Sequence, residues 1–92
     1  PDYGTQEVAD TAVTLAMSLR RGIPLYHDAM RGADPCRWGV IPSKIVRRFE
    51  VQTFGVLGLG RIGTAAALRA KAMGFRVVFY DPHLPNGADR AI

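Results

Sequence analysis

The sequence lacks the features that mark several specialised classes of protein. Its one cysteine, Cys36, excludes an internal disulfide and the small secreted domains that depend on one. No apolar run approaches the roughly 20 residues that a membrane-spanning helix needs. The N-terminus lacks the charged-then-apolar pattern of a secretory signal. The ten glycines and six prolines follow no period, which excludes a collagen-like chain. We therefore expect a cytoplasmic protein that has no membrane partner.

The charge balance is basic, with twelve Lys and Arg residues against eight Asp and Glu residues and a net charge of +4. A basic surface attracts nucleic acids or smaller anions. The basic residues here neither line one helix face nor interleave with aromatic residues, so nucleic acid is not the expected partner. His27 and His83 have no second ligand at metal-binding spacing, so no metal site is expected. Cys36 is interpreted as an inert thiol.

The length and the first residue indicate part of a longer chain. The 92 residues begin at Pro1 rather than Met, and they are few for an enzyme. We expect residues 1–92 to form part of one domain. Within it we expect a helix of the kind that joins two domains (1–22), a short helix with an irregular connection (23–52) and a strand–helix–strand unit (53–92). The rest of the domain and a substrate domain are expected outside this chain.

Two helices are predicted in the first third of the chain. The first starts near Thr5, which is the expected N-cap, and ends at Gly22, which is able to turn left-handed. A second, shorter helix is predicted from Pro24 to Arg31. Residues 44–52 fit neither helical nor strand spacing. We expect the first helix to bury one apolar stripe of residues at helical spacing, which consists of Val8, Ala12, Leu15 and Leu19. Ala9 and Ala16 lie beside this stripe.

The second half of the chain predicts a βαβ unit. Two short apolar runs, Thr53–Leu57 and Arg76–Tyr80, show no clean alternation, which is typical of strands in a buried parallel sheet. An alanine-rich helix is predicted between them, from Thr64 to Met73, with Gly74 as its stop. A strand, a helix and a strand in this order form a right-handed crossover. The fold class that we predict is therefore α/β, with part of a Rossmann-type doubly wound parallel sheet.

The connection from the first strand to its helix carries the motif G-x-G-x-x-G at 58–63. Gly58 permits the tight turn, Gly60 lets the backbone approach a pyrophosphate, and Gly63 lets the helix pack close to the sheet. Asp81 ends the next strand and follows Gly58 by 23 residues, near the separation of about 20 at which an acid accepts hydrogen bonds from a ribose. This combination indicates dinucleotide binding. A flavin or S-adenosylmethionine site would share the ribose contact and stays open.

The acid also favours NAD over NADP. A 2′-phosphate on the ribose would place negative charge against the Asp81 carboxylate. Pro82 follows directly, and no arginine lies within the next several residues to accept a phosphate.

Four segments resemble the NAD-binding domain of the D-isomer-specific 2-hydroxyacid dehydrogenases. They are the glycine motif at 58–63, the run Ala-Leu-Arg-Ala-Lys-Ala-Met-Gly at 67–74, Phe-Tyr-Asp-Pro at 79–82 and Glu-Val-Ala-Asp at 7–10. The residues from Ala67 to Asp81 are most similar to the branch of the family that contains the C-terminal-binding-protein corepressors. Val51 departs from the family, which usually carries Gly there.

The resemblance implies roles for particular residues. Arg61 and Ile62 would contact the pyrophosphate, Asp81 the ribose, and Val8 would approach the nicotinamide half of NAD. The family's catalytic Arg, Glu and His lie downstream of its βαβ unit, so no catalytic residue is expected in this chain. The family also dimerises near the first helix, so a homodimer is expected.

Two functions that use the glycine motif remain open from these residues, and a basic nucleic-acid-binding domain is a third reading. The first is an oxidoreductase that transfers a hydride between NAD and a 2-hydroxy or 2-keto acid. The alternative is a corepressor-like module that senses NAD(H) without significant turnover, for which a nuclear location would be expected. Both would use the same glycine motif and the same Asp81.

Overall fold

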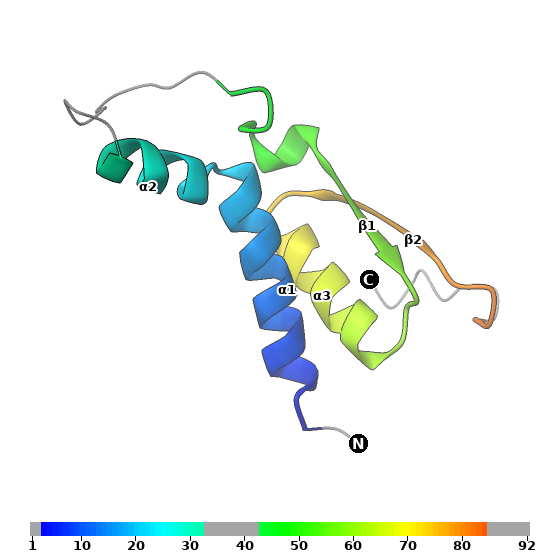
Figure 1. The fold of residues 1–92 in the computed structure, drawn as a ribbon. Coiled ribbons are helices and arrows are strands. Elements are labelled where there is room, and N and C mark those ends of the chain that lie inside the picture. Colours follow the sequence, from blue (N-terminus) through cyan, green and yellow to red (C-terminus); the bar gives the residue numbers. More distant parts are fainter. Residues whose placement is uncertain (1–2, 33–42, 85–92) are drawn as a thin grey trace.

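The computed structural model describes residues 3–32 and 43–84 (Figure 1). Cys36 and most of the connection predicted after the second helix lie outside the described residues. The elements, in chain order, are α1 (Thr5–Arg20), α2 (Ile23–Gly32), a short 3₁₀ helix (Phe49–Val51), β1 (Thr53–Leu57), α3 (Arg61–Ala72) and β2 (Arg76–Tyr80). No helix in these described ranges is long and apolar enough to cross a membrane.

The two strands form the predicted parallel sheet. β1 pairs with β2 from Thr53 opposite Arg76 to Leu57 opposite Tyr80, and both strands have the bounds that the sequence predicted. α3 connects them, so the βαβ unit and the α/β class are confirmed. Because the strands are parallel, their carboxyl ends lie at the same edge, next to the start of α3 (Figure 1).

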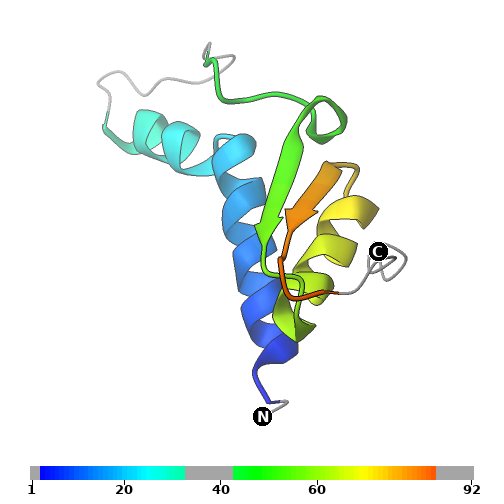
Figure 2. The same ribbon diagram turned by 90° about the vertical axis from the view of Figure 1, so that its right-hand side faces the viewer.

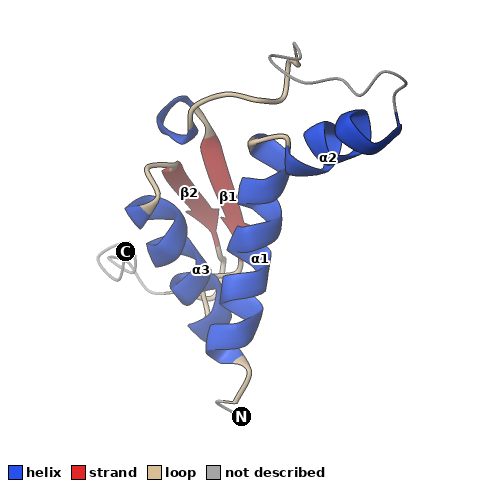
Figure 3. Cartoon of the chain, turned by 90° about the vertical axis from the view of Figure 1, so that its left-hand side faces the viewer, coloured by secondary structure: helices blue, strands red, loops and turns tan. Residues whose placement is uncertain are grey.

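The helices α1 and α3 lie on one side of the sheet, as opposite views of the chain show (Figures 2 and 3). The face of β1 and β2 toward α3 is apolar. Val56 of β1 is buried together with Leu59 and with Ala67 of α3, and Val77 and Phe79 of β2 pack against them. Ala67 and Ala70 are fully buried, and their small side chains let the helix lie close to the strands.

The other face of the sheet is exposed in the described part of the chain. Leu57, Val78 and Tyr80 have 88, 45 and 66% of their surface accessible. The sequence predicted that both faces of the sheet are buried, but the described residues cover only the face toward α3.

α1 packs on α3 through a different stripe from the predicted one. Ala9 and Val13 are buried against Ala66 of α3, and Met17 continues the same face. Most of the predicted stripe is exposed instead, with Leu15 and Leu19 showing 65 and 55% of their surface. Both stripes have helical spacing, so periodicity alone does not distinguish them. The buried one begins with alanine, which permits close contact between the two helices.

The helix starts also differ from the prediction. Thr5 is not a cap: Gly4, with φ of 87°, is the N-cap of α1, and no side chain caps the helix. α3 starts at Arg61, three residues before the predicted start, because the carbonyl of Gly60 already accepts a hydrogen bond from the N–H of Thr64 at 2.8 Å. The glycine at the end of α1 is as predicted, since Gly22 has φ of 73°.

Candidate functional site

The glycine turn lies where β1 ends and α3 begins. Gly58 leaves β1 with φ of 92°, in the left-handed region that favours glycine. Its N–H donates to the carbonyl of Tyr80 at 2.9 Å, which fixes the turn to the end of β2. The hydroxyl of Thr64 donates to the carbonyl of Leu59 at 3.4 Å and holds the middle of the turn against the helix. The turn is therefore tied to both neighbouring elements.

Gly63 and Gly60 are glycine for different reasons. A Cβ on Gly63 would overlap the carbonyl oxygen of Gly58 and lie 3.2 Å from Cγ1 of Val56, so packing inside the protein requires glycine there. A Cβ on Gly60 would meet no protein atom within 4 Å, and Gly60 has a negative φ of −83°. Nothing inside the described protein requires glycine at position 60. Glycine at position 60 is explained if a ligand must approach the backbone closely there, because a side chain would fill the space that the ligand needs.

The start of α3 is suited to an anion. No side chain caps this helix, and its first turn contains no acidic residue. The N–H groups of a first helical turn have no partner within the helix and carry the positive end of its dipole. A hollow of about 540 Å³ lies over this turn, and its wall includes all five predicted residues of the motif: Gly58, Gly60, Arg61, Ile62 and Gly63.

Asp81 is joined directly to the glycine turn. One carboxylate oxygen accepts a hydrogen bond from the N–H of Leu59 and the other from the N–H of His83, each at 2.9 Å. The hydrogen bonds from His83 and then Leu59 lower the pKa of Asp81 below its ordinary value of 3.8, so the group is ionised at neutral pH. An ionised carboxylate has about four acceptor positions. Two therefore remain for the hydroxyl groups of a ligand.

A second hollow, also of about 540 Å³, adjoins the first and lies between α1 and α3. The two hollows share Thr5, Gly60 and Arg61, while Gln6 lines only the second. Sequence reasoning missed Thr5 and Gln6 as site residues. They lie far from the glycine motif in sequence, and only the packing of α1 on α3 brings them to it.

Val8 is not brought to the glycine turn. Its side chain is 49% exposed and lines a separate hollow on α1 with Glu7, Thr11 and Leu15 among others. The contact between Val8 and the nicotinamide half stays a prediction. His27 lies on α2, where its ring contacts Arg31 at 3.4 Å. Within the described ranges, no group of three His, Cys, Asp or Glu residues is arranged to hold a metal ion.

Taken together, the turn and Asp81 define a dinucleotide-binding βαβ unit: an open anion-binding turn, and a carboxylate beside it with acceptor positions to spare. The comparison with known proteins then gives the family. Residues 13–91 match the NAD-binding domain of the D-isomer specific 2-hydroxyacid dehydrogenases, and the chain belongs to this family. The family predicted from the sequence is confirmed, and so is NAD as its cofactor.

Individual relatives agree with this family. C-terminal-binding protein 1 of Caenorhabditis elegans is 38% identical, over 99% of this chain and 13% of that protein. D-3-phosphoglycerate dehydrogenase of Methanocaldococcus jannaschii is 33% identical, over 94% of this chain and 16% of that protein. The structure of D-lactate dehydrogenase with NAD⁺ from Lactobacillus jensenii matches with a TM-score of 0.81 and 32% identity, over 99% of this chain and 27% of that one. The chain thus spans less than a third of each relative.

The two glycines give a paired prediction. We expect Gly63→Ala to lower the free energy of unfolding by about 1–3 kcal/mol, the usual cost of overpacking, because its Cβ overlaps the Gly58 carbonyl. Gly60→Ala should leave that free energy nearly unchanged and weaken NADH binding instead. Urea unfolding and NADH titration of the full-length protein measure both effects. Equal destabilisation by the two variants, or undiminished NADH binding by Gly60→Ala, would contradict this assignment.

Proposed function

We propose that this chain is the cofactor-binding part of an NAD-dependent oxidoreductase that interconverts a 2-hydroxy acid and a 2-keto acid. The observation that carries the proposal is the open space at Gly60, at the uncapped start of α3 and beside the Asp81 carboxylate. These three features fit a pyrophosphate flanked by a ribose.

Each residue has a distinct part in holding the cofactor. The N–H groups at the start of α3, from Arg61 and Ile62, donate to the pyrophosphate oxygens, and the dipole of α3 favours their negative charge. Asp81 accepts hydrogen bonds from the ribose hydroxyls through its remaining acceptor positions. Gly58 and Gly63 keep the turn in the shape that leaves room for the phosphates. When bound, NAD accepts or supplies the hydride of the reaction.

The proton-transfer groups are expected elsewhere in the protein. Of the described residues that line the two hollows, none is a histidine, a lysine or a carboxylic acid. The side chains there bind and orient a ligand but offer no general base of ordinary kind. We propose that the substrate-binding Arg and the acid–base pair come from parts of the protein outside this chain, as the family resemblance implies.

An NAD(H)-sensing corepressor-like module would use the same site, and C-terminal-binding protein 1 is among the relatives. The dehydrogenases among the relatives and the solved structures favour the enzyme. An assay of the full-length protein with NADH and small 2-keto acids separates the two. Turnover supports the dehydrogenase, and NADH-dependent assembly without turnover supports the module. A cytoplasmic location stays a prediction.

We also propose that the exposed stripe of α1 is the interface of a homodimer. Ala12, Leu15 and Leu19 are exposed and form an apolar stripe beside the face of α1 that carries Ala9 and Val13, and a hollow of about 410 Å³ adjoins Ala12 and Leu15. A second copy of the same helix, related by twofold symmetry, would offer a matching apolar stripe.

Asp81 should determine which cofactor binds. We expect Asp81→Ser to raise the dissociation constant for NADH by about tenfold or more, because two charge-assisted hydrogen bonds are lost. Binding of NADPH should improve, since the repulsion between the carboxylate and the 2′-phosphate disappears. Fluorescence titrations at fixed ionic strength measure both constants. Asp28→Asn on α2 is the control and should change neither. An unaltered ratio of the NADH and NADPH constants in Asp81→Ser would sink the ribose assignment.

The interface proposal has its own test. Leu15→Glu places a charge in the apolar stripe, whereas it leaves the packing of α1 on α3 untouched. We expect sedimentation to show a dimer for the unaltered full-length protein and a shift toward monomer for Leu15→Glu. Glu7→Gln, at the edge of the same hollow, is the control that should remain dimeric. A monomeric unaltered protein, or a Leu15→Glu dimer of equal strength, would show that the interface lies elsewhere.

A further inference from the structure

Arg69 joins α3 to α1 through its whole guanidinium group. Its Nε donates to Oδ1 of Asp10 at 2.6 Å, and its Nη2 donates to the side-chain oxygen of Gln6. Its Nη1 donates to the carbonyl of Ala65, one turn earlier on α3, at 3.0 Å. Asp10 and Gln6 lie four residues apart and therefore on the same face of α1. The two contacts to α1 fix its first turns against α3, where the two helices lie side by side (Figure 1), and the contact to Ala65 orients the guanidinium on α3 itself.

Two of these partners are walls of the hollow between the helices. Gln6 and Ala65 both line it, together with Thr5 and Gly60. Arg69 itself does not line that hollow, and neither does Asp10. The guanidinium thus contacts two residues that line the hollow, Gln6 and Ala65, while Arg69 is not itself part of the lining. Its own side chain is only 31% exposed, which limits the freedom of the link.

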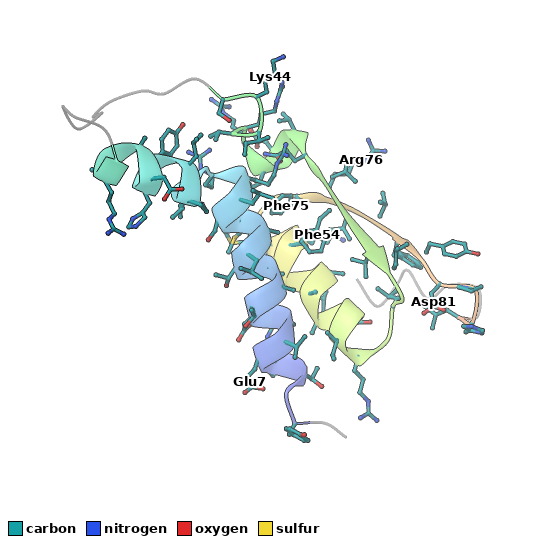
Figure 4. All side chains as sticks on the ribbon, viewed as in Figure 1. Glu7, Lys44, Phe54, Phe75, Arg76 and Asp81 are labelled. Carbon is teal, nitrogen blue, oxygen red and sulfur yellow. The ribbon has the colours of Figure 1, made fainter. Side chains whose placement is uncertain are left out.

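The position of this hollow relative to Asp81 assigns it to one half of the cofactor. Asp81 lies past the end of β2, on the far side of the glycine turn from α1, as Figure 4 shows by comparison with Glu7 on α1. Asp81 lines neither hollow. If the ribose of the adenosine half is at Asp81 and the pyrophosphate is at the turn, the other half of the dinucleotide extends toward α1, over Thr5 and Gln6.

We propose that Arg69 is a positioning residue for the nicotinamide half of NAD. It holds Gln6 and the first turn of α1 at the distance from α3 that this half requires. The proposal rests on the proposed function, because it takes the adenosine ribose and pyrophosphate to be bound at Asp81 and the glycine turn. Arg69 acts through Gln6 and α1 and does not itself touch the cofactor.

Arginine suits this role better than lysine. The guanidinium is a rigid plane whose donors point in fixed directions, so one group holds Asp10, Gln6 and the Ala65 carbonyl together. A lysine ammonium keeps the charge and an attraction to Asp10, but it does not reproduce three contacts in one plane. Arg69→Lys therefore loosens the link without removing the positive charge from α3.

The test compares NADH with ADP as probes of the full-length protein. ADP contains the adenosine ribose and the pyrophosphate but lacks the nicotinamide half. For Arg69→Lys we expect the dissociation constant for NADH to rise about three- to tenfold, the factor typical of lost hydrogen bonds at a partly exposed group. The constant for ADP should stay unchanged. Arg76→Lys, at the opposite end of the sheet, is the matched control (Figure 4).

Asp10→Asn gives a second, independent variant. It keeps the shape of the side chain and one oxygen acceptor but removes the charge, and Asp10 reaches the hollow only through Arg69. We expect the same selective loss of NADH affinity, smaller than in Arg69→Lys. In the double variant the two effects should not add, because both act through one link.

The outcomes separate this inference from the proposed function. Selective loss of NADH affinity, with ADP binding retained, supports the positioning role. Equal loss for NADH and ADP would mean that Arg69 only stabilises the fold, and no loss for either would mean that the link does not act on the site. Both results overturn the inference. Absence of binding of both probes by the unaltered protein would overturn the proposed function itself.

Discussion

The contact between Gly63 and the carbonyl of Gly58 is the constraint on which the rest of the site depends. It leaves no room for a Cβ, so the first turn of α3 lies directly against the backbone that leaves β1. That closeness sets the start of α3, which no side chain caps, at the carboxyl edge of the sheet. It also brings Leu59 to Asp81, whose carboxylate accepts the Leu59 N–H across the turn. An anion site and a ribose site thereby share one short piece of backbone.

The second half of the site depends on how α1 packs. Ala9 and Val13 lie against Ala66, so the two helix axes approach closely, and the Arg69 link sets their relative position near the N-terminal turn of α1. At the other end of the sheet, Phe75 stacks on Phe49 and meets Phe54 edge to face, at ring centroid distances of 4.4 and 5.6 Å (Figure 4). These aromatic contacts join the 3₁₀ helix, β1 and the start of β2. The sheet is therefore packed at both ends, by the aromatic rings where its strands begin and by the contacts of the glycine turn where they end.

Much of this could be predicted from the sequence because it is local. A βαβ unit spans only about thirty residues, and its pattern is local. That pattern was enough to predict the strand bounds, the roles of Gly58 and Gly63 and the position of Asp81. The wrong face of α1 was predicted because two solutions have the same periodicity. α1 carries two apolar stripes, and only the partner helix decides that Ala9 and Val13 are buried while Leu15 is not. Thr5 and Gln6 were missed because no local pattern joins them to Gly60, and only the packing of α1 on α3 brings them there.

Binding of NADH at the glycine turn is tested most directly by a crystal structure of the full-length protein with NADH bound. We expect pyrophosphate oxygens about 3 Å from the backbone nitrogens of Arg61 and Ile62, at hydrogen-bonding distance. We also expect the Asp81 carboxylate to accept hydrogen bonds from both hydroxyls of the adenosine ribose. A cofactor whose pyrophosphate lies away from the glycine turn, or whose ribose does not contact Asp81, would contradict the assignment of these residues to NAD.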